Sequence, residues 1–160
     1  MPGPSRIGVR SDTISDTNLS LATCDMPPNA PNRCRPLTVL EVHHVAVNVS
    51  DLDASSAFYS AAFGFATRRR TQFREIVGRG DVELHLFQAP EGIRFDGPRN
   101  WRHLGVQHLA FTVSDDELER ALEVLAAQGA GADGPIQDGA GTALYTRDPD
   151  GNVIELRARR

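Results

Sequence analysis

The stretch His44–Leu52, with the sequence HVAVNVSDL, recurs later in the chain as His108–Asp116, with the sequence HLAFTVSDD. In both copies large aliphatic residues alternate with smaller or polar ones, which is the period of a half-buried strand. A helix-capping signal follows each strand, and Gly64 or Gly129 then ends the predicted helix at nearly the same distance from the histidine. The chain therefore contains an internal repeat of one structural unit.

Each copy is predicted to contain a strand, a helix and three further strands. The first helix covers residues 52–63, and its buried stripe is expected at Leu52, Phe58, Tyr59 and Phe63. The second helix begins at the capping box of residues 114–117 and is followed by a glycine-rich loop, a strand over 142–147, a turn and a last strand over 152–157. We expect module one over about residues 39–90 and module two over about residues 104–157.

Composition restricts the possible functions. A chain of 160 residues with a net charge of −4 fits one domain, and it has no broad positive field for nucleic acid or an anionic membrane. The run Arg68-Arg69-Arg70 is interpreted as a solvated strand end or loop. All 17 basic residues are arginine, which excludes Schiff-base chemistry and a P-loop lysine. Acid–base chemistry is therefore left mainly to carboxylates and histidines.

The first part of the chain differs from the repeat. Six of the ten prolines lie in residues 1–36, which show no sustained period of a helix or a strand. We expect residues 1–38 to be a disordered or loosely docked tail, or a segment that orders against a partner subunit, followed by a domain over 39–160. Because no run is apolar enough for a signal peptide or a membrane span, we expect a cytoplasmic protein.

The repeat places one histidine and one glutamate at corresponding positions of each copy. His44 and His108 begin the first strands, and Glu83 and Glu155 lie in the last strands. All four are on the face opposite the large aliphatics, so the packing of the aliphatics under the helices should turn these four side chains toward one another. Buried charges need partners, and a divalent cation is one partner that suits two nitrogens and two oxygens. A single strand histidine is more often a hydrogen-bonded core or rim residue, but the repetition favours a metal site.

Three strings resemble the vicinal oxygen chelate superfamily, the group of glyoxalases, bleomycin-resistance proteins and extradiol dioxygenases. They are HHVAVNVSDLDASSAFYSAAFGF, VQHLAFTVSDDELERALEVLAAQG and RDPDGNVIEL, and the resemblance covers about Val39 to Arg157. It implies an α+β fold in which paired βαβββ modules form a cupped, barrel-like mixed sheet with the helices outside. It also implies one divalent metal ion (Zn, Ni, Co, Mn or Fe(II)) and no nucleotide cofactor. The ligands that it implies are His44, His108, Glu155 and, as the fourth, Glu83.

The carboxylate at Glu83 resembles the glyoxalase I pattern and favours a metal-dependent isomerase, epimerase or lyase. On this hypothesis the ion polarises a carbonyl of a small oxygenated substrate, and Glu83 or Glu155 moves the proton. His85 could replace Glu83 as a ligand, act as the acid–base group or hydrogen-bond at the rim. The side chains expected to contact substrate are Asn48, Phe87, Tyr145 and Arg147.

Two alternatives remain open from the sequence. An Fe(II) extradiol-type dioxygenase would use His44, His108 and Glu155, with Glu83 as a bystander. A non-enzymatic drug-binding resistance protein would use the cup as a sequestration groove. In each case the expected partner is a small molecule, with no nucleic acid and no membrane. Resemblance to the superfamily also predicts a homodimer, and the sequence leaves open whether one chain or two build each site.

Overall fold

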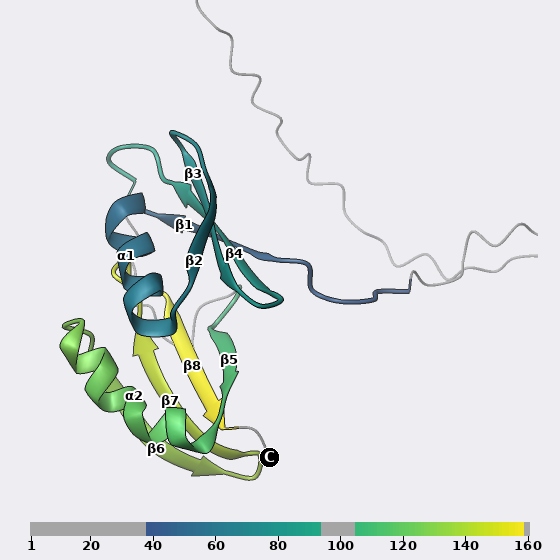
Figure 1. The fold of residues 1–160 in the computed structure, drawn as a ribbon, viewed down its shortest axis with the longest axis vertical. Helices are drawn as coiled ribbons and strands as arrows, with labels where there is room; N and C mark the ends of the chain where they lie inside the picture. Colours follow the sequence, from purple (N-terminus) through teal and green to yellow (C-terminus); the bar gives the residue numbers. More distant parts are fainter. Residues whose placement is uncertain (1–37, 94–104, 159–160) are drawn as a thin grey trace, which may run out of the picture. The chain divides into compact units, whose positions relative to one another are not determined.

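The computed structural model describes residues 38–93 and 105–158. The predicted tail over residues 1–38 lies almost entirely outside that part. Residues Glu41–Arg160 form one compact unit. This unit contains two consecutive modules, each with the order strand, helix and three strands that the repeat predicts (Figure 1).

The first module is built on a mixed four-stranded sheet with the order β1-β4-β3-β2. Strand β1 is parallel to β4, and the other neighbours are antiparallel. Its elements are β1 (Val45–Val49), α1 (Leu52–Phe63), β2 (Ala66–Arg70), β3 (Arg74–Arg79) and β4 (Val82–Gln88). In β1 the valines are buried or half-buried, whereas Ala46 and Asn48 are exposed, as the alternation predicts. The strand begins at Val45, one residue after the start of the predicted repeat at His44.

The second module repeats this topology with the sheet order β5-β8-β7-β6. Its elements are β5 (Leu109–Val113), α2 (Asp115–Ala127), β6 (Ala132–Asp138), β7 (Gly141–Arg147) and β8 (Val153–Ala158). Strand β6 corrects the prediction of a glycine-rich loop over this region. The sequence ADGPIQD has no alternation, but β6 is an almost wholly exposed edge strand, where a proline and polar residues are tolerated.

The helix ends follow the predicted capping signals. The Asp51 carboxylate accepts the N–H groups of Asp53 and Ala54 at 2.8 and 3.0 Å at the start of α1. Gly64 ends this helix with a φ of 67°, which is the left-handed conformation that favours glycine. Ser114 accepts the N–H of Glu117 at 3.3 Å at the start of α2. Local sequence therefore determines where both helices begin, and each helix leads the chain away from the first strand of its sheet.

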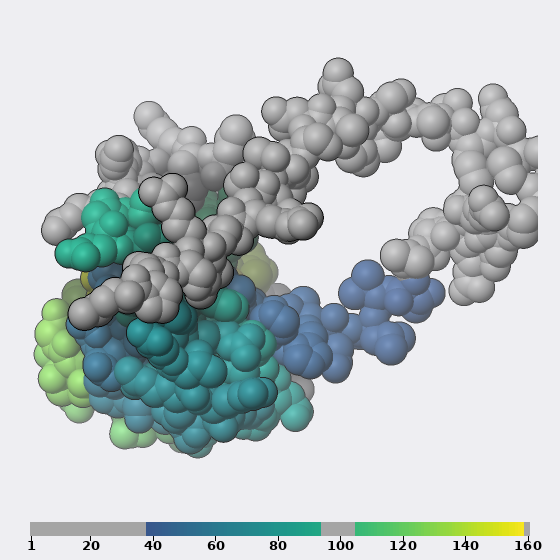
Figure 2. Space-filling model, turned by 90° about the horizontal axis from the view of Figure 1, so that it is seen from above, coloured from purple at the N-terminus to yellow at the C-terminus, as the bar shows by residue number. Residues whose placement is uncertain are grey.

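The two modules share one hydrophobic core. Its buried members come from both helices and both sheets, and partly buried side chains such as Phe63 and Phe111 pack against it. The Phe111 ring lies 5.6 Å from the rings of Phe63 and Phe65, so module one and module two are in direct aromatic contact. The space-filling view shows the side chains of module one, in blue to teal, packed together on its visible face (Figure 2). The predicted fold class, an α+β pair of cupped mixed sheets, is confirmed.

A polar contact between the modules completes this packing. The fully buried Tyr59 hydroxyl of α1 donates to Asp148 at 3.0 Å, and Asp150 accepts the Ser50 N–H at 3.0 Å. Asp148 also accepts both the backbone and the side-chain N–H of Asn152, which closes the turn between β7 and β8. The DPDG turn thus sets the start of β8, the strand that carries Glu155. No helix within residues 38–93 and 105–158 is both long and apolar enough to cross a membrane.

Candidate metal centre

Strand register places Glu83 and His85 on the face of their sheet opposite the helix, whereas His44 and His108, which were expected to begin the first strands, immediately precede β1 and β5. In module one, β1 pairs with β4 so that Ala46 lies beside His85, and β3 pairs with β4 so that Gly78 lies beside Glu83. Residues paired across a ladder point to the same face, so His85 and Glu83 share this face with Ala46 and Gly78. The opposite face carries Leu84 and Leu86, which are buried in the core. The sequence alternation therefore correctly predicts which side of the sheet these residues occupy.

Glu83 and His85 form the centre of the first half-site. His85 Nε2 lies 2.7 Å from Glu83 Oε1, and Arg68 donates to Glu83 Oε2 at 3.0 Å. The hydrogen bond to His85 and the neighbouring Arg68 lower the pKa of Glu83, which keeps this carboxylate ionised at neutral pH. The His44 ring stacks on the His85 ring at 3.9 Å. His85 thus contacts both predicted ligands of module one, and its Nε2 atom lies beside the Glu83 carboxylate.

Glu155 and His108 form the second half-site. His108 Nε2 lies 2.9 Å from Glu155 Oε2, and Arg157 donates from Nε to Glu155 Oε1 at 2.6 Å. The Glu155 side chain is only 5% exposed, whereas the His108 side chain is 29% exposed. Tyr145 lies beside Glu155 in the ladder between β7 and β8, and its ring meets His108 edge-on at 5.9 Å. A buried carboxylate and an accessible imidazole are therefore held next to each other.

These donors fit a divalent cation in chemistry, and each half-site supplies part of the ligand set. Ligands at 2.0–2.2 Å from one ion lie about 3 Å apart in octahedral and about 3.4 Å apart in tetrahedral geometry. The 2.7 and 2.9 Å nitrogen–oxygen distances in the two half-sites are hydrogen-bond distances, slightly shorter than either. Across residues 38–93 and 105–158, however, no group of three histidine, cysteine, aspartate or glutamate side chains is placed to hold a metal ion. The four predicted ligands thus lie in two separate half-sites: His85 contacts both His44 and Glu83 in module one, and His108 contacts Glu155 in module two.

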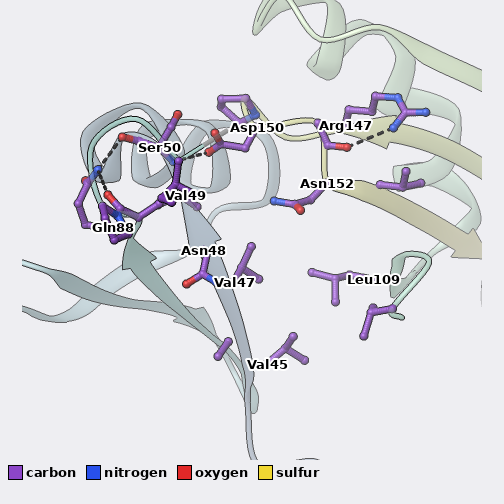
Figure 3. A pocket seen from close by; sticks show the side chains of 18 of the residues that line it. Val45, Val47, Asn48, Val49, Ser50, Gln88, Leu109, Arg147, Asp150 and Asn152 are labelled. Atoms are coloured by element: carbon purple, nitrogen blue, oxygen red, sulfur yellow. Dashed lines mark hydrogen bonds between the residues drawn. The ribbon is translucent and has the colours of Figure 1, made fainter. Parts of the chain in front are cut away.

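A cleft of about 1500 Å³ lies between β1 and β5. Figure 3 shows Val45 and Val47 of β1 facing Leu109 of β5 across this cleft. Two of the predicted substrate-contacting residues, Asn48 and Arg147, line the cleft, as does the ligand candidate His108. Arg147 is turned toward the β7–β8 turn, where it donates to the Gly151 carbonyl at 3.2 Å.

The other two predicted substrate contacts lie on the open sheet faces. Phe87 is half-buried on β4 beside Asn48, and the Arg74 guanidinium lies 5.8 Å from the centre of its ring. Tyr145 lies beside Glu155, as described above, and does not line the cleft between β1 and β5. The predicted substrate residues thus divide between the cleft and the two half-sites.

Arginines form a part of the site that the sequence analysis did not predict. Arg68 and Arg157 each donate to one of the two carboxylates, and Asp138 pairs with Arg157. The run Arg68-Arg69-Arg70 is an exposed edge strand, as expected, but Arg68 and Arg70 are in ion pairs with Glu83 and Glu75. The sequence contained one indication of the contact between Arg157 and Glu155: Arg157 follows Glu155 by two residues, as His85 follows Glu83.

Comparison with known proteins gives the family context of this geometry. Residues 41–156 match the family model described as the Glyoxalase/Bleomycin resistance protein/Dioxygenase superfamily. The chain is 30% identical over 129 residues to the metallothiol transferase FosB of Lysinibacillus sphaericus, covering 75% of this chain and 83% of that protein. It is 44% identical over 82 residues to biphenyl-2,3-diol 1,2-dioxygenase 2 of Rhodococcus globerulus, covering 48% of this chain and 41% of that protein.

Two further relatives support the same assignment. A lactoylglutathione lyase of Arabidopsis thaliana is 26% identical over 125 residues, covering 72% of this chain and 43% of that protein. Among solved structures, the glyoxalase family protein from Enterococcus faecalis has a TM-score of 0.62 and 29% identity, covering 73% of this chain and 96% of that chain. The sequence and the fold thus point to one and the same superfamily.

Proposed function

Because the chain belongs to the glyoxalase/bleomycin resistance protein/dioxygenase superfamily, we propose that it is a divalent-metal-dependent isomerase, epimerase or lyase for a small oxygenated substrate. Relatives named as a metallothiol transferase, a lactoylglutathione lyase and a dioxygenase support an enzyme rather than a binding protein. The observation that carries the proposal is the duplicated imidazole–carboxylate contact, at 2.7 Å in module one and 2.9 Å in module two.

The proposed ligands are His108 and Glu155 from module two, with Glu83 and His44 or His85 from module one. The ion, when bound, supplies a Lewis acid that polarises a carbonyl or two adjacent oxygens of the substrate. Glu83 is ionised at neutral pH and can therefore accept a proton, although the contacts from His85 and Arg68 that lower its pKa also make it a weaker base. His85 contacts Glu83 at 2.7 Å and can pass that proton on. Glu155 is held by Arg157 and His108, which suits a fixed ligand.

We further propose that the enzyme is a homodimer in which each metal centre combines module one of one chain with module two of the other. Three observations support this proposal. Within the described residues one chain supplies no complete ligand group. Strands β1 and β5 each have a neighbour on one side only. Apolar side chains around the cleft remain exposed, namely Phe73 (63%), Ile93 (63%) and Val106 (75%), and a second copy would bury such surface.

Mixing two inactive variants tests the shared site. Glu83→Gln damages module one and His108→Ala damages module two, so each homodimer has two damaged sites. If sites are shared between chains, a mixed dimer contains one intact and one doubly damaged site, and random exchange restores about a quarter of the wild-type activity. If each site lies within one chain, no combination restores activity. Wild-type protein taken through the same mixing and exchange procedure gives the reference activity.

One observation favours a second candidate function, an Fe(II) extradiol-type dioxygenase. Glu83 is 18% exposed and is held by His85 and Arg68, whereas Glu155 is 5% exposed and lies beside His108, so the two carboxylates differ as a bystander and a ligand of a His44, His108 and Glu155 triad would. The 44% identity to the dioxygenase over 82 residues points the same way. Oxygen consumption with catechols after anaerobic Fe(II) loading decides between the two functions. Consumption that survives Glu83→Gln would establish the dioxygenase, whereas metal-dependent isomerisation without oxygen uptake supports the main proposal.

A further inference from the structure

The carboxylate of Glu155 is connected to the far edge of its sheet by a continuous series of contacts. Arg157 lies on the same face of β8, and its Nε and Nη2 atoms each lie 2.6 Å from Glu155 Oε1. The same guanidinium donates to both oxygens of Asp138, from Nη1 at 3.0 Å and from Nη2 at 2.8 Å. Asp138 in turn accepts the N–H of Ala140 at 2.7 Å in the β6–β7 turn. The turn, Asp138, Arg157 and Glu155 therefore form one connected unit.

The guanidinium of Arg157 is fully paired within this unit before any ligand binds, and the two carboxylates leave the unit with a net negative charge. Every nitrogen of the Arg157 guanidinium has a carboxylate partner, so this arginine is not available to bind an anionic group of a substrate. Asp138 offsets the positive charge that Arg157 would otherwise place beside a cation. The hydrogen bond from Arg157 holds the pKa of Asp138 well below its usual range, so Asp138 remains ionised across neutral pH.

Module one has no equivalent of this arrangement. The residue two positions after Glu83 is His85, and the arginine that contacts Glu83 comes from β2 and donates its second bond to the Gly80 carbonyl. The Glu83 side chain is 18% exposed, compared with 5% for Glu155. Only one of the two carboxylates is thus fixed by an arginine that is itself held by a second carboxylate.

We propose that Asp138 and Arg157 are positioning residues that fix Glu155 and leave its Oε2 atom, beside His108, as the oxygen offered to the metal. This inference rests on the proposed function, because it assigns a role toward the ion that the half-sites would bind. It adds two residues to the site and gives the two carboxylates different roles. Outer contacts of this kind typically change metal affinity by 10–100-fold when they are removed.

The test is a titration of the metal-free full-length protein with Mn²⁺ alone, followed by calorimetry. Asp138→Asn and Arg157→Met should weaken Mn²⁺ binding about 10–100-fold. Arg157→Lys should recover part of the affinity, because it keeps the charge but not the two-pronged geometry. Matched controls are Asp81→Asn and Arg69→Met, which change exposed residues of the same types and should bind Mn²⁺ as the wild type does.

Additional readouts separate positioning from a general structural role. Asp138→Asn loses contacts that stabilise the fold, so its Mn²⁺ affinity is measured where circular dichroism shows the variant fully folded. Its KM should change less than its kcat, because neither Asp138 nor Arg157 binds substrate. Wild type that binds Mn²⁺ while both variants bind it within about threefold would overturn this inference and leave the proposed function intact. Wild type that binds no Mn²⁺, Zn²⁺, Ni²⁺, Co²⁺ or Fe²⁺ would overturn both.

Discussion

Substituting Tyr59 with phenylalanine removes one hydroxyl from the contact between the two modules. The ring of Tyr59 is fully buried, and its hydroxyl donates at 3.0 Å to Asp148, which is 5% exposed. A hydrogen bond to a charged group contributes about 1.5–3 kcal/mol, and little solvent screens this one. Asp148 keeps its bonds to the backbone N–H groups of Asp150 and Asn152. Tyr59→Phe should therefore lower the free energy of unfolding at pH 8 by about 2 kcal/mol.

The difference in free energy of unfolding between wild type and Tyr59→Phe should change sign at high pH. Burial, and then the negative charge of Asp148, raises the pKa of Tyr59 far above its ordinary value of about 10. The folded protein therefore keeps a proton that the unfolded chain releases above pH 10, so the stabilisation is complete below pH 10 and is lost as the pH rises. The loss amounts to about 1.4 kcal/mol per pH unit. An advantage of about 2 kcal/mol for the wild type should thus disappear between pH 11 and 12.

The composition of the chain makes this measurement unusually clean. There is no lysine, and the sequence has only two tyrosines, so few side chains titrate near pH 10. Urea unfolding followed by circular dichroism, from pH 7 to pH 11.5, gives the free energy of unfolding for wild type and Tyr59→Phe. Tyr145→Phe is the matched control, and it should keep the alkaline loss. Equal stability of wild type and Tyr59→Phe at pH 8, or the same slope in both above pH 10, would refute the reasoning.

Two further substitutions test the packing beneath and beside the half-sites. Glu75 is 1% exposed and accepts bonds from Ser56, Thr67 and Arg70, so Glu75→Gln should destabilise the protein by about 3 kcal/mol in urea unfolding without changing metal affinity; a cost below about 1 kcal/mol would contradict this. Gly78 lies beside Glu83, and a Cβ there would overlap the Val82 carbonyl and lie 3.1 Å from the Arg68 guanidinium carbon. Gly78→Ala should therefore cost about 1–3 kcal/mol and weaken Mn²⁺ binding, whereas the control Gly131→Ala, which has open space, should do neither.

Much of the fold could be predicted because its signals are local. Alternating residues indicated β1 and β5, and the capping residues Asp51, Gly64 and Ser114 indicated the helix ends. Strand β6 was not predicted because an exposed edge strand needs no apolar face, and its only apolar residues are an alanine and an isoleucine.

The candidate site was predictable only in part, for a related reason. The period of a strand determines which face His44, Glu83, His108 and Glu155 occupy, and the repeat made their correspondence visible. The contacts among them depend on register and on distant strands: Asp138 reaches Arg157 across the sheet, and Arg68 reaches Glu83 from β2. The division into two half-sites depends on how whole modules pack, which a pattern within each module does not determine.

The most direct test of the account is the metal content of the full-length protein after chelator treatment and reconstitution. Protein dialysed against Mn²⁺ or Zn²⁺ and then analysed for metal should contain one ion per chain. Both Glu155→Gln and His108→Ala should lose that ion while remaining folded, because each removes one of the two proposed ligands of module two. Folded wild type that retains no divalent ion under these conditions, or variants that retain a full complement, would contradict the claim that the duplicated imidazole–carboxylate pairs form a metal centre.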